Sequence, residues 1–540
     1  MWIAAGCRFR RFWLGKFPSA AKHPGMFLGL DSSTQSLTAV LIDPSSGEIT
    51  CQLAVNFGGD LAQYAAPNGF IPGGANGEVH SNPAMWLDAL DLLFSRLAAT
   101  TDLSKVTMIA GSGQQHGSVY LDASFGTRLA SLDPGQGLAA QIAPAFTRQT
   151  APIWMDTSTG EECAEITATL GGPAEVCRRS GSIAIERFTG PQIRRFFKAD
   201  PAAYARTGHI HLVSSFIASV IAGKSVAIDY GDGAGMNLLN LATLGWDREL
   251  LDATAPGLLE KLPPLAAATT VQGRVSDYFV RKFGLSCDCR CALFTGDNPA
   301  SLVGMGATSP GNIVISLGTS DTFFAAMPEP KTDPNGFGHV FGNPAGGFMS
   351  LICFRNGSLA REALRDQLGL DWPAFDGAPR ATREAAGSNL MLPFFGPEIT
   401  PRRDFTGPVL QGSPAFESGA QPALQVRALL EGQFLNMRLH SQWMEVKADR
   451  IRITGGASKN DGVPQIVADV FQAPVDRLEV SNSAALGAAL IAAAAAGHDL
   501  PALQQVFCQT SPGSSLLPDP ALGPVYQDSL RRFASLLESV

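Results

Sequence analysis

Two stretches of the chain show the same order of apolar and polar positions. Residues Phe27 to Asp43 begin with an apolar run, pass through a short turn of Ser, Thr and Gln, and continue with a second apolar run. Residues 312–326 repeat this order around a turn of Gly, Thr and Ser. Such a pattern predicts a β-hairpin. Because the two predicted hairpins begin about 285 residues apart, the pattern indicates two similar halves.

Each predicted half then alternates strand-like and helix-like segments, which is typical of an α/β protein. Apolar residues recur at helical spacing in three segments, at 84–99, 426–443 and 484–496. Short predicted strands at 106–110 and 452–454 end directly in glycine-rich turns. We place the boundary after residue 308, which gives a first domain of residues 26–308. The second domain, residues 309–540, is expected to end in a helical tail.

The composition is that of a folded protein with more than one core. Of the 540 residues, 45% are hydrophobic and 16% are charged, so the chain can bury enough apolar surface to fold. The formal net charge is −8, so the chain lacks the excess of basic residues that is typical of a nucleic-acid-binding protein. The most apolar run, 484–497, is shorter than the roughly 20 residues that a membrane-spanning helix needs. We therefore expect neither a nucleic-acid nor a membrane partner.

Nine cysteines form an odd, scattered set without the spacing of a disulfide scaffold. This usage suits a reducing compartment, and we expect a cytoplasmic protein. Cys287, Cys289 and Cys291 alternate, which predicts that they share one face of a strand. No histidine lies near them to complete a zinc site, so a buried strand face is the favoured interpretation.

Residues 1–25 differ in composition from the rest of the chain, with five basic residues and no acidic residue. This composition is typical of a mitochondrial presequence. The alternative is an over-extended start, with Met26 as the true initiator just before an apolar strand, and we favour this second interpretation. In either case we expect the segment to lie outside the fold.

Three short segments rich in small polar residues follow apolar strands, at 31–36, 318–320 and 455–458. Glycine lets the backbone approach an anion, and successive N–H groups and hydroxyls then form a concave cradle for phosphate. One such segment could be a simple connecting turn, but three together indicate a nucleoside triphosphate site. A P-loop is excluded at residues 223–225 (GKS), because Ala218 stands where its first glycine must be.

The segment Gly111–Gly117 (GSGQQHG) follows the predicted strand at 106–110 and superficially resembles a dinucleotide fingerprint. Gln114, Gln115 and His116, however, would place bulky polar groups where a pyrophosphate should touch bare backbone. Three hydrogen-bonding side chains after a strand suit a polyhydroxylated ligand better.

Two acidic residues follow predicted strands and could take part in chemistry. Asp31 lies where the first apolar strand enters its polar turn, a position suited to holding Mg²⁺ through water. Asp297 follows the predicted strand at 291–294 and could either project into a site or only cap a helix expected from Pro299. Composition leaves these two alternatives open. For Asp232, in a glycine-rich loop, a structural turn is favoured over catalysis.

Three further positions also have both a functional and a structural interpretation. Arg187, beside Phe188, could hold substrate hydroxyls through its fork of N–H groups, or could form a solvated salt bridge as most arginines do. Lys459 and Asn460, after the third loop, could bind a ribose or lie at the surface.

Taken together, these segments resemble the motifs of the FGGY carbohydrate kinases, and within that family those of the eukaryotic-type xylulose kinases. The resemblance covers about residues 26–500. Six motifs occur in order, namely Gly111–Gly117 (GSGQQHG), Glu186–Gly190 (ERFTG), Asp229–Asn237 (DYGDGAGMN), Thr295–Ser301 (TGDNPAS), Ser316–Asp321 (SLGTSD) and Thr454–Asn460 (TGGASKN). The resemblance implies two actin-like, RNase H-like α/β domains with an active-site cleft between them. Sugar would lie mainly against the first domain and ATP against the second.

The resemblance also implies an activity, which is ATP-dependent phosphorylation of D-xylulose to D-xylulose 5-phosphate. It implies ATP and Mg²⁺ as cofactors and a monomer or homodimer as the assembly. Asp297 resembles the general base, and Asp31 the acid that organises Mg²⁺ through water. The residues that match the ketose site are Gln115, His116, Arg187, Asp297 and Asn298. Those that match the ATP site are Thr34, Gly318, Thr319, Ser320, Trp372, Gly455, Gly456, Ala457 and Asn460.

The chain departs from the family pattern in two places. The stretch after Gly190 lacks the lysine and tryptophan of other sugar kinases in the family, and Pro397–Pro401 (PEITP) varies a usual Gly-Glu-Arg-Thr-Pro. Both departures weaken the similarity to the bacterial subgroup. The rival functions are a kinase for ribulose, glycerol or another polyol, and an actin-like or Hsp70-like ATPase. An inactive binding relative is disfavoured because both Asp31 and Asp297 are present.

Overall fold

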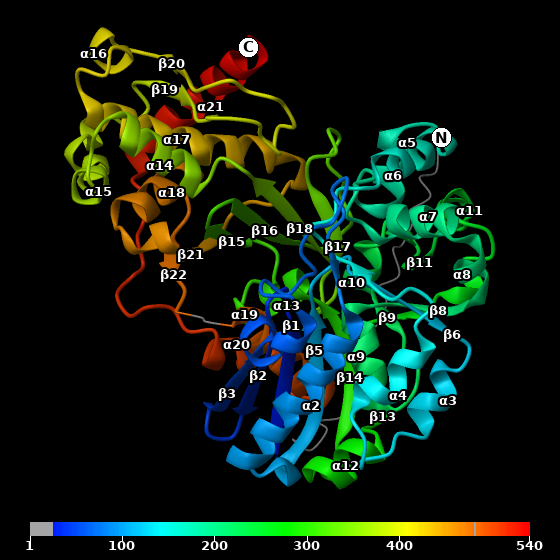
Figure 1. Ribbon diagram of the computed structural model, residues 1–540. Helices are drawn as coiled ribbons and strands as arrows, with labels where there is room; N and C mark the ends of the chain where they lie inside the picture. Colours follow the sequence, from blue (N-terminus) through cyan, green and yellow to red (C-terminus); the bar gives the residue numbers. More distant parts are fainter. Residues whose placement is uncertain (1–24, 480–481) are drawn as a thin grey trace, which may run out of the picture.

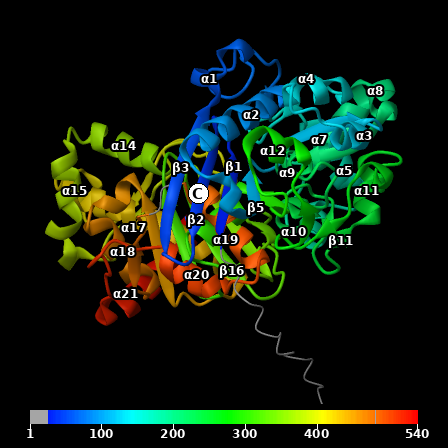
Figure 2. The same ribbon diagram turned by 90° about the horizontal axis from the view of Figure 1, so that it is seen from below.

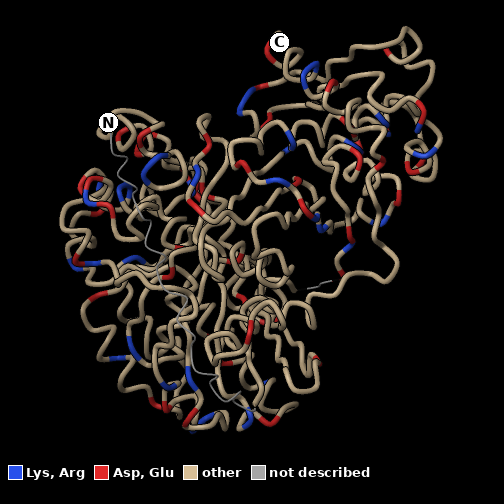
Figure 3. Tube along the Cα trace, turned by 180° about the vertical axis from the view of Figure 1, so that it is seen from behind, with Lys and Arg blue, Asp and Glu red and all other residues tan. Residues whose placement is uncertain are grey.

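The computed structural model describes residues 25–479 and 482–540, and it shows two α/β domains, each built on a six-stranded sheet (Figure 1). The α/β class expected from the sequence is confirmed. The two interpretations of the N-terminal segment fall almost entirely on residues 1–24, which lie outside the described residues. Basic and acidic side chains are interspersed over both domains (Figure 3).

The first sheet contains the first predicted hairpin and has the strand order β13-β14-β5-β1-β2-β3. Its strands are β1 (Met26–Ser32), β2 (Ser36–Asp43), β3 (Glu48–Asn56), β5 (Val106–Gly113), β13 (Val271–Arg274) and β14 (Arg290–Gly296). β1, β2 and β3 are antiparallel neighbours, whereas β5 runs parallel to both β1 and β14. The carboxyl ends of β1, β5 and β14 therefore lie at the same edge of the sheet.

The second sheet repeats this arrangement around the second predicted hairpin, in the order β17-β18-β16-β15-β21-β22. Its strands are β15 (Asn312–Leu317), β16 (Asp321–Met327), β17 (His339–Gly342), β18 (Phe348–Phe354), β21 (Arg450–Gly455) and β22 (Val475–Arg477). Antiparallel β15, β16 and β18 correspond to β1, β2 and β3, while parallel β21 and β22 correspond to β5 and β14. The two similar halves predicted from the hairpins are confirmed.

The three predicted helices are present, as α2 (Pro83–Thr100), α17 (Pro422–His440) and α19 (Ser483–Ala495). Successive side chains of β1 point to opposite faces of the sheet, and both faces are buried. Phe27 packs in the cluster that includes α19, whereas Leu28 packs in the cluster that includes α2 and α9 (Val213–Ala222). Helices from distant parts of the chain thus cover the two faces of the first sheet.

Helix α19 belongs to the second half of the chain but packs against the sheet of the first domain (Figure 2). It also packs along α13 (Asp297–Gly304), and glycine permits both close approaches. A Cβ added to Gly29 of β1 would stand 2.1 Å from the carbonyl oxygen of Ala485, and one on Gly487 would stand 1.8 Å from that of Ala300. Helix α19 therefore connects the second half of the chain to the first sheet. It lies beside α13, the helix whose first residue is Asp297.

Further helices of the second domain lie around its sheet, and they include α14 (Ser358–Gln367), α15 (Trp372–Ala381), α18 (Gly462–Phe471) and the C-terminal α21 (Gly523–Glu538). Helix α20 (Leu500–Phe507) packs instead against α19 and α13, in the cluster that contains Phe27 of the first sheet. Helix α21, the expected helical tail, packs against α17. In the described parts of the chain, no helix has the length and apolar character needed to cross a membrane.

An insertion between β5 and β14 extends the first domain beyond the sheet. Its helices include α5 (Gly160–Thr169), α6 (Pro173–Ser180), α7 (Thr189–Ala199), α8 (Pro201–Arg206), α10 (Tyr230–Ala234) and α11 (Arg248–Thr254). Cys289, just before β14, and Cys291, within β14, are buried as predicted, but the prediction for Cys287 was wrong. Cys287 is exposed because it lies in the turn that precedes the strand.

Candidate active site

The ends of three parallel strands bring polar side chains together at one edge of the first sheet. Ser112 of β5 is paired with Asp31 of β1 on one side and with Thr295 of β14 on the other. The Ser112 hydroxyl donates a hydrogen bond of 2.7 Å to Oδ1 of Asp31. One row of the sheet thus extends from Asp31 towards Asp297, which directly follows the last residue of β14.

Asp31 and Asp297 are two neighbouring carboxylates, of which Asp31 is buried and Asp297 is partly exposed. Burial raises the pKa of Asp31 to about 6, although the Ser112 hydrogen bond opposes this rise. Burial and, as a smaller cause, the charge of Asp31 together raise the pKa of Asp297 to about 7. Asp297 is the first residue of α13, and the cap position is occupied by Gly296. The interpretation of Asp297 as a mere helix cap is therefore wrong.

Gln115 and Asn298 form a hydrogen-bonded pair beside Asp297. The Asn298 amide donates to Oε1 of Gln115 at 2.8 Å and to Oδ1 of Asp297 at 3.0 Å. Gln115 is 2% exposed, and its Nε2 group has no hydrogen-bond partner among the described residues. A buried N–H group without a partner costs free energy, so this position suits a ligand oxygen.

His116 is held in one orientation on the same side of the sheet. Its Nδ1 lies 2.7 Å from the carbonyl oxygen of Gly235, so Nδ1 donates and Nε2 is an acceptor. Its ring stacks on Phe188 with centroids 4.2 Å apart. Burial, aided by the charge of Arg187, lowers the pKa of His116 to about 3. His116 is therefore a neutral hydrogen-bond acceptor.

Arg187 does not form a solvated salt bridge, which was one of the two alternatives left open by the sequence. Its guanidinium lies 3.2 Å from Nε2 of His339 and 5.5 Å from the ring centroid of Phe188. Burial lowers the pKa of Arg187, and no carboxylate within the described residues pairs with it. His339 belongs to β17 of the second sheet, and nothing in its sequence context singled it out.

Asp232 lies near Asp297, although the sequence favoured a purely structural turn at this position. It lies in helix α10, is 1% exposed, and accepts a hydrogen bond from Ser214 on one oxygen. Its other oxygen has no hydrogen-bond partner in the part of the chain that the structure describes. Burial raises the pKa of Asp232 well above its usual value, and the charges of Asp229 and Asp297 raise it further. Asp232 is thus a buried acid near Asp297, a proximity that only the folded chain reveals.

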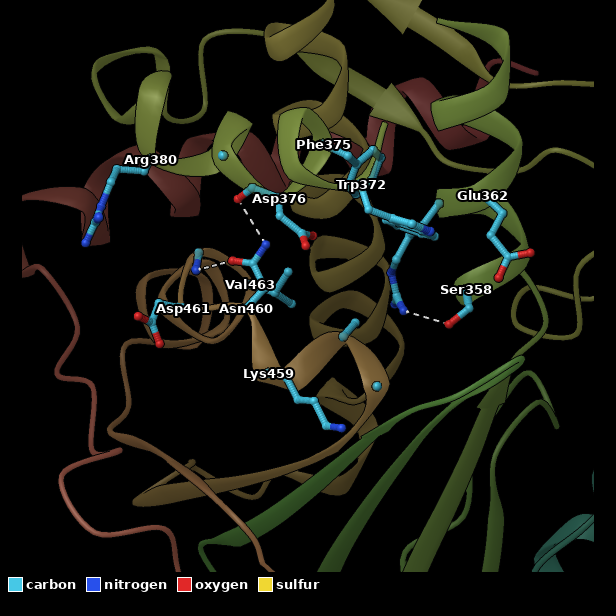
Figure 4. A pocket seen from close by; sticks show the side chains of 15 residues that line it. Ser358, Glu362, Trp372, Phe375, Asp376, Arg380, Lys459, Asn460, Asp461 and Val463 are labelled. Carbon is cyan, nitrogen blue, oxygen red and sulfur yellow. Dashed lines mark hydrogen bonds between the residues drawn. The ribbon is translucent and has the colours of Figure 1, made fainter. Parts of the chain in front are cut away.

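A separate pocket of about 630 Å³ lies wholly in the second domain, between helices α14, α15 and α18 and the loop after β21 (Figure 4). Four residues matched to the ATP site line it, namely Trp372, Gly456, Ala457 and Asn460. Trp372 is 42% exposed, and the Arg365 guanidinium covers one ring face at 4.4 Å. Asn460 donates to the carbonyl oxygen of Asp376 at 3.0 Å across the pocket. Lys459 also lines the pocket.

The loop Gly318–Ser320 connects β15 to β16 next to this pocket. Ser358, which lines the pocket, donates its backbone N–H to the carbonyl oxygen of Gly318 at 3.0 Å. The loop is followed by Asp321, whose buried carboxylate forms an ion pair with Arg361. The third segment begins at Gly455, which ends β21 and is paired with Leu317.

Thr34 differs in placement from the other residues matched to the ATP site. It lies in the turn between β1 and β2 of the first domain, and its hydroxyl accepts a hydrogen bond of 2.8 Å from the indole N–H of Trp154. Trp154 is itself 45% exposed. Thr34 therefore lies near the carboxylate pair and not in the second-domain pocket.

Comparisons with known proteins agree with this arrangement. Residues 148–304 match the N-terminal domain of the FGGY family of carbohydrate kinases, and residues 313–496 match its C-terminal domain. Xylulose kinase 2 of Arabidopsis thaliana is 40% identical, with 87% of each chain covered. Xylulose kinase of Rattus norvegicus is 38% identical over 95% of this chain and 96% of its own.

A solved structure supports the same conclusion. The crystal structure of a xylulose kinase from Brucella ovis, 25% identical, superposes with a TM-score of 0.78 over 95% of this chain and 99% of its own. The resemblance noted from six sequence motifs is thereby confirmed. With both domains matched in order, and relatives similar over most of their length, the chain belongs to the FGGY family of carbohydrate kinases.

Proposed function

We propose that this protein transfers the terminal phosphoryl group of ATP to D-xylulose, giving D-xylulose 5-phosphate and ADP. The observation that supports a phosphoryl transfer best is the position of Asp297. This carboxylate has a raised pKa and lies beside the hydrogen-bonding side chains of Gln115 and Asn298. The choice of xylulose is supported by the relatives named xylulose kinase at 40% and 38% identity. Family membership favours a sugar acceptor over an actin-like or Hsp70-like ATPase.

The ketose would be held by groups whose donor and acceptor roles are already assigned. His116 offers Nε2 as an acceptor for a hydroxyl proton, because its Nδ1 donates to Gly235. Gln115 offers its free Nε2 as a donor, and Arg187 offers the N–H groups that do not face His339. Asn298 completes the set beside Asp297. These fixed groups orient the acceptor hydroxyl before reaction.

Asp297 would act as the general base for this hydroxyl. As the sugar oxygen attacks the terminal phosphorus, the bond to the ADP oxygen breaks and the hydroxyl proton passes to a carboxylate oxygen of Asp297. A pKa of about 7 makes this carboxylate a stronger base than an exposed aspartate while it remains largely ionised at a slightly alkaline pH.

The nucleotide would bind in the second-domain pocket. Trp372 would pack against the adenine, and Gly456, Ala457 and Asn460 would contact the adenosine from the opposite wall. Backbone N–H groups of the loop Gly318–Ser320 would surround the terminal phosphate. Gly455 would let its strand end approach that loop, and Thr34 would meet the phosphates from the first domain.

Asp31 suits a magnesium ion that accompanies ATP. It is a hard oxygen ligand at a strand end, its charge is not paired with any basic side chain in the described chain, and a second carboxylate lies beside it. No group of three metal-ligating side chains occurs among the described residues, which fits an ion held mainly by phosphate and water. When bound, Mg²⁺ would supply positive charge that offsets the charge of the phosphate groups.

The test is ADP release measured across a panel of acceptors with ATP and Mg²⁺. We expect kcat/KM for D-xylulose to exceed the values for D-ribulose, glycerol and other polyols. A higher value for one of those acceptors would replace xylulose while leaving the kinase assignment intact. ATP turnover that does not depend on any sugar would instead support the ATPase and contradict the proposal.

A further inference from the structure

His339 of the second domain touches the sugar-binding side of the first domain. It is the first residue of β17 and is 2% exposed. Its Nε2 lies 3.2 Å from Nη2 of Arg187, and its Nδ1 lies 3.1 Å from the hydroxyl of Ser182. Both partners belong to the insertion of the first domain. His339 of the second domain thus forms a direct hydrogen bond with Arg187 of the first domain, the residue proposed to bind the sugar.

The hydrogen-bonding direction at His339 is fixed by its partner. A guanidinium has only donors, so Nε2 of His339 must accept from Arg187 and its proton must be on Nδ1. Nδ1 then donates to the hydroxyl of Ser182. Phe188 lies beside both groups, with its ring 5.4 Å from the His339 ring and its face towards the Arg187 guanidinium. Arg187 is therefore oriented by one acceptor and one aromatic ring.

Strand β17 cannot shift easily relative to the sugar-binding elements. The N–H of Val340 donates to the carbonyl oxygen of Gly181 at 3.0 Å, next to Ser182. On the other side, a Cβ added to Gly342 would stand 2.7 Å from Tyr230 at the start of α10. The second-domain strand is packed tightly between two elements of the first domain. This fixed packing sets the position of the His339 ring.

We propose that His339 is a positioning residue that orients Arg187 towards the ketose, so that the second domain takes part in sugar recognition as well as nucleotide binding. This inference rests on the proposed role of Arg187 in the ketose site. A long arginine side chain has many rotamers, and holding it ready for the ligand removes an ordering cost from sugar binding. His339 itself need not touch the sugar.

Two substitutions separate an orienting role from simple packing. His339→Phe keeps an aromatic ring of similar size but removes the acceptor for Arg187, whereas His339→Gln keeps an acceptor oxygen. For His339→Phe we expect KM for D-xylulose to rise about 10-fold, in the range for losing a hydrogen bond to a charged group. KM for ATP should stay near the wild-type value. For His339→Gln we expect KM for D-xylulose to recover most of this loss.

A matched control is His211→Phe. His211 is also buried and bonded to two serine hydroxyls, of Ser215 and Ser225, and neither serine is among the residues assigned to the candidate site. We expect this variant to lose stability without a specific rise in KM for D-xylulose. Equal changes in KM for His211→Phe and His339→Phe would overturn the proposal.

A double-substitution cycle tests whether His339 acts through Arg187. If it does, adding His339→Phe to Arg187→Met should raise the Kd for D-xylulose, measured by calorimetry without nucleotide, less than twofold beyond Arg187→Met alone. Full additivity of the two effects would overturn the inference. If instead the wild-type protein neither binds nor phosphorylates D-xylulose, the proposed function fails before the variants are compared, so the two failures are distinguishable.

Discussion

The two domains place different chemistry at the same point of the same fold. In the first sheet the last paired residues of β1 and β5 are Ser32 and Gly113, and in the second sheet those of β15 and β21 are Leu317 and Gly455. Counted from these ends, Asp31 corresponds to Ser316. The first domain therefore has an acid where the second has a hydroxyl.

The third strand sharpens this difference. Strand β14 extends to the sheet edge, with Gly296 opposite Gly113, so that Asp297 emerges beside Asp31. Its counterpart β22 ends at Arg477, opposite Ile453 and short of the edge. The acid near the second edge, Asp321, is neutralised by Arg361. Within the described residues, the acids at the first edge thus have no basic partner, whereas the acid near the second edge has one. This difference supports the proposed division, with base and metal ligand in the first domain and phosphate binding in the second.

The largest expected effect comes from removing the base of the first domain. For Asp297→Asn we expect kcat to fall by about 10²- to 10⁴-fold, because the amide cannot accept the hydroxyl proton. Steady-state ADP release checks this, and circular dichroism confirms that the variant is folded. The matched change in the second domain is Asp321→Asn, which weakens the buried pair with Arg361. We expect Asp321→Asn to lower the melting temperature, and to lower kcat far less than Asp297→Asn does.

A second prediction concerns the glycine at the edge of the second sheet. Gly455 has a φ of 96°, and an added Cβ would lie 2.1 Å from the carbonyl oxygen of Leu317. For Gly455→Ala we expect a loss of about 1–3 kcal/mol in the free energy of unfolding, visible as a melting temperature several degrees lower. The control is Gly456→Ala, where nothing lies within 4 Å of an added Cβ. Equal melting temperatures for the two variants would contradict this account of the loop.

The smallest expected effect is on nucleotide affinity. Trp372 lies at the pocket but is 42% exposed and already packed against Arg365 on one face. We expect Trp372→Ala to raise KM for ATP by about 2- to 10-fold, the range for losing one aromatic contact, with little change in kcat. Measurement of both constants checks this. A fall in kcat as large as that of Asp297→Asn would remove the proposed division between the two domains.

The sequence predicts local features well and contacts between distant segments poorly. The apolar pattern identifies both hairpins and the helices α2, α17 and α19, because periodicity depends on near neighbours. It does not show that α19 packs against the first sheet, that Asp232 lies near Asp297, or that His339 bonds to Arg187. Those contacts join segments that only the folded chain brings together, and no spacing along the chain indicates them.

The most direct test of the central claim, that Asp297 is the base and that the charge of Asp31 helps burial to raise its pKa, is the pH dependence of kcat/KM for D-xylulose. Because the base must be ionised, we predict that activity falls as the pH drops through about 7, the pKa of Asp297. Asp31→Asn removes the neighbouring charge that raises this pKa, so the acidic limb of its residual activity should move to lower pH. An acidic limb that stays in place in this variant, or one that persists in Asp297→Asn, would contradict the account.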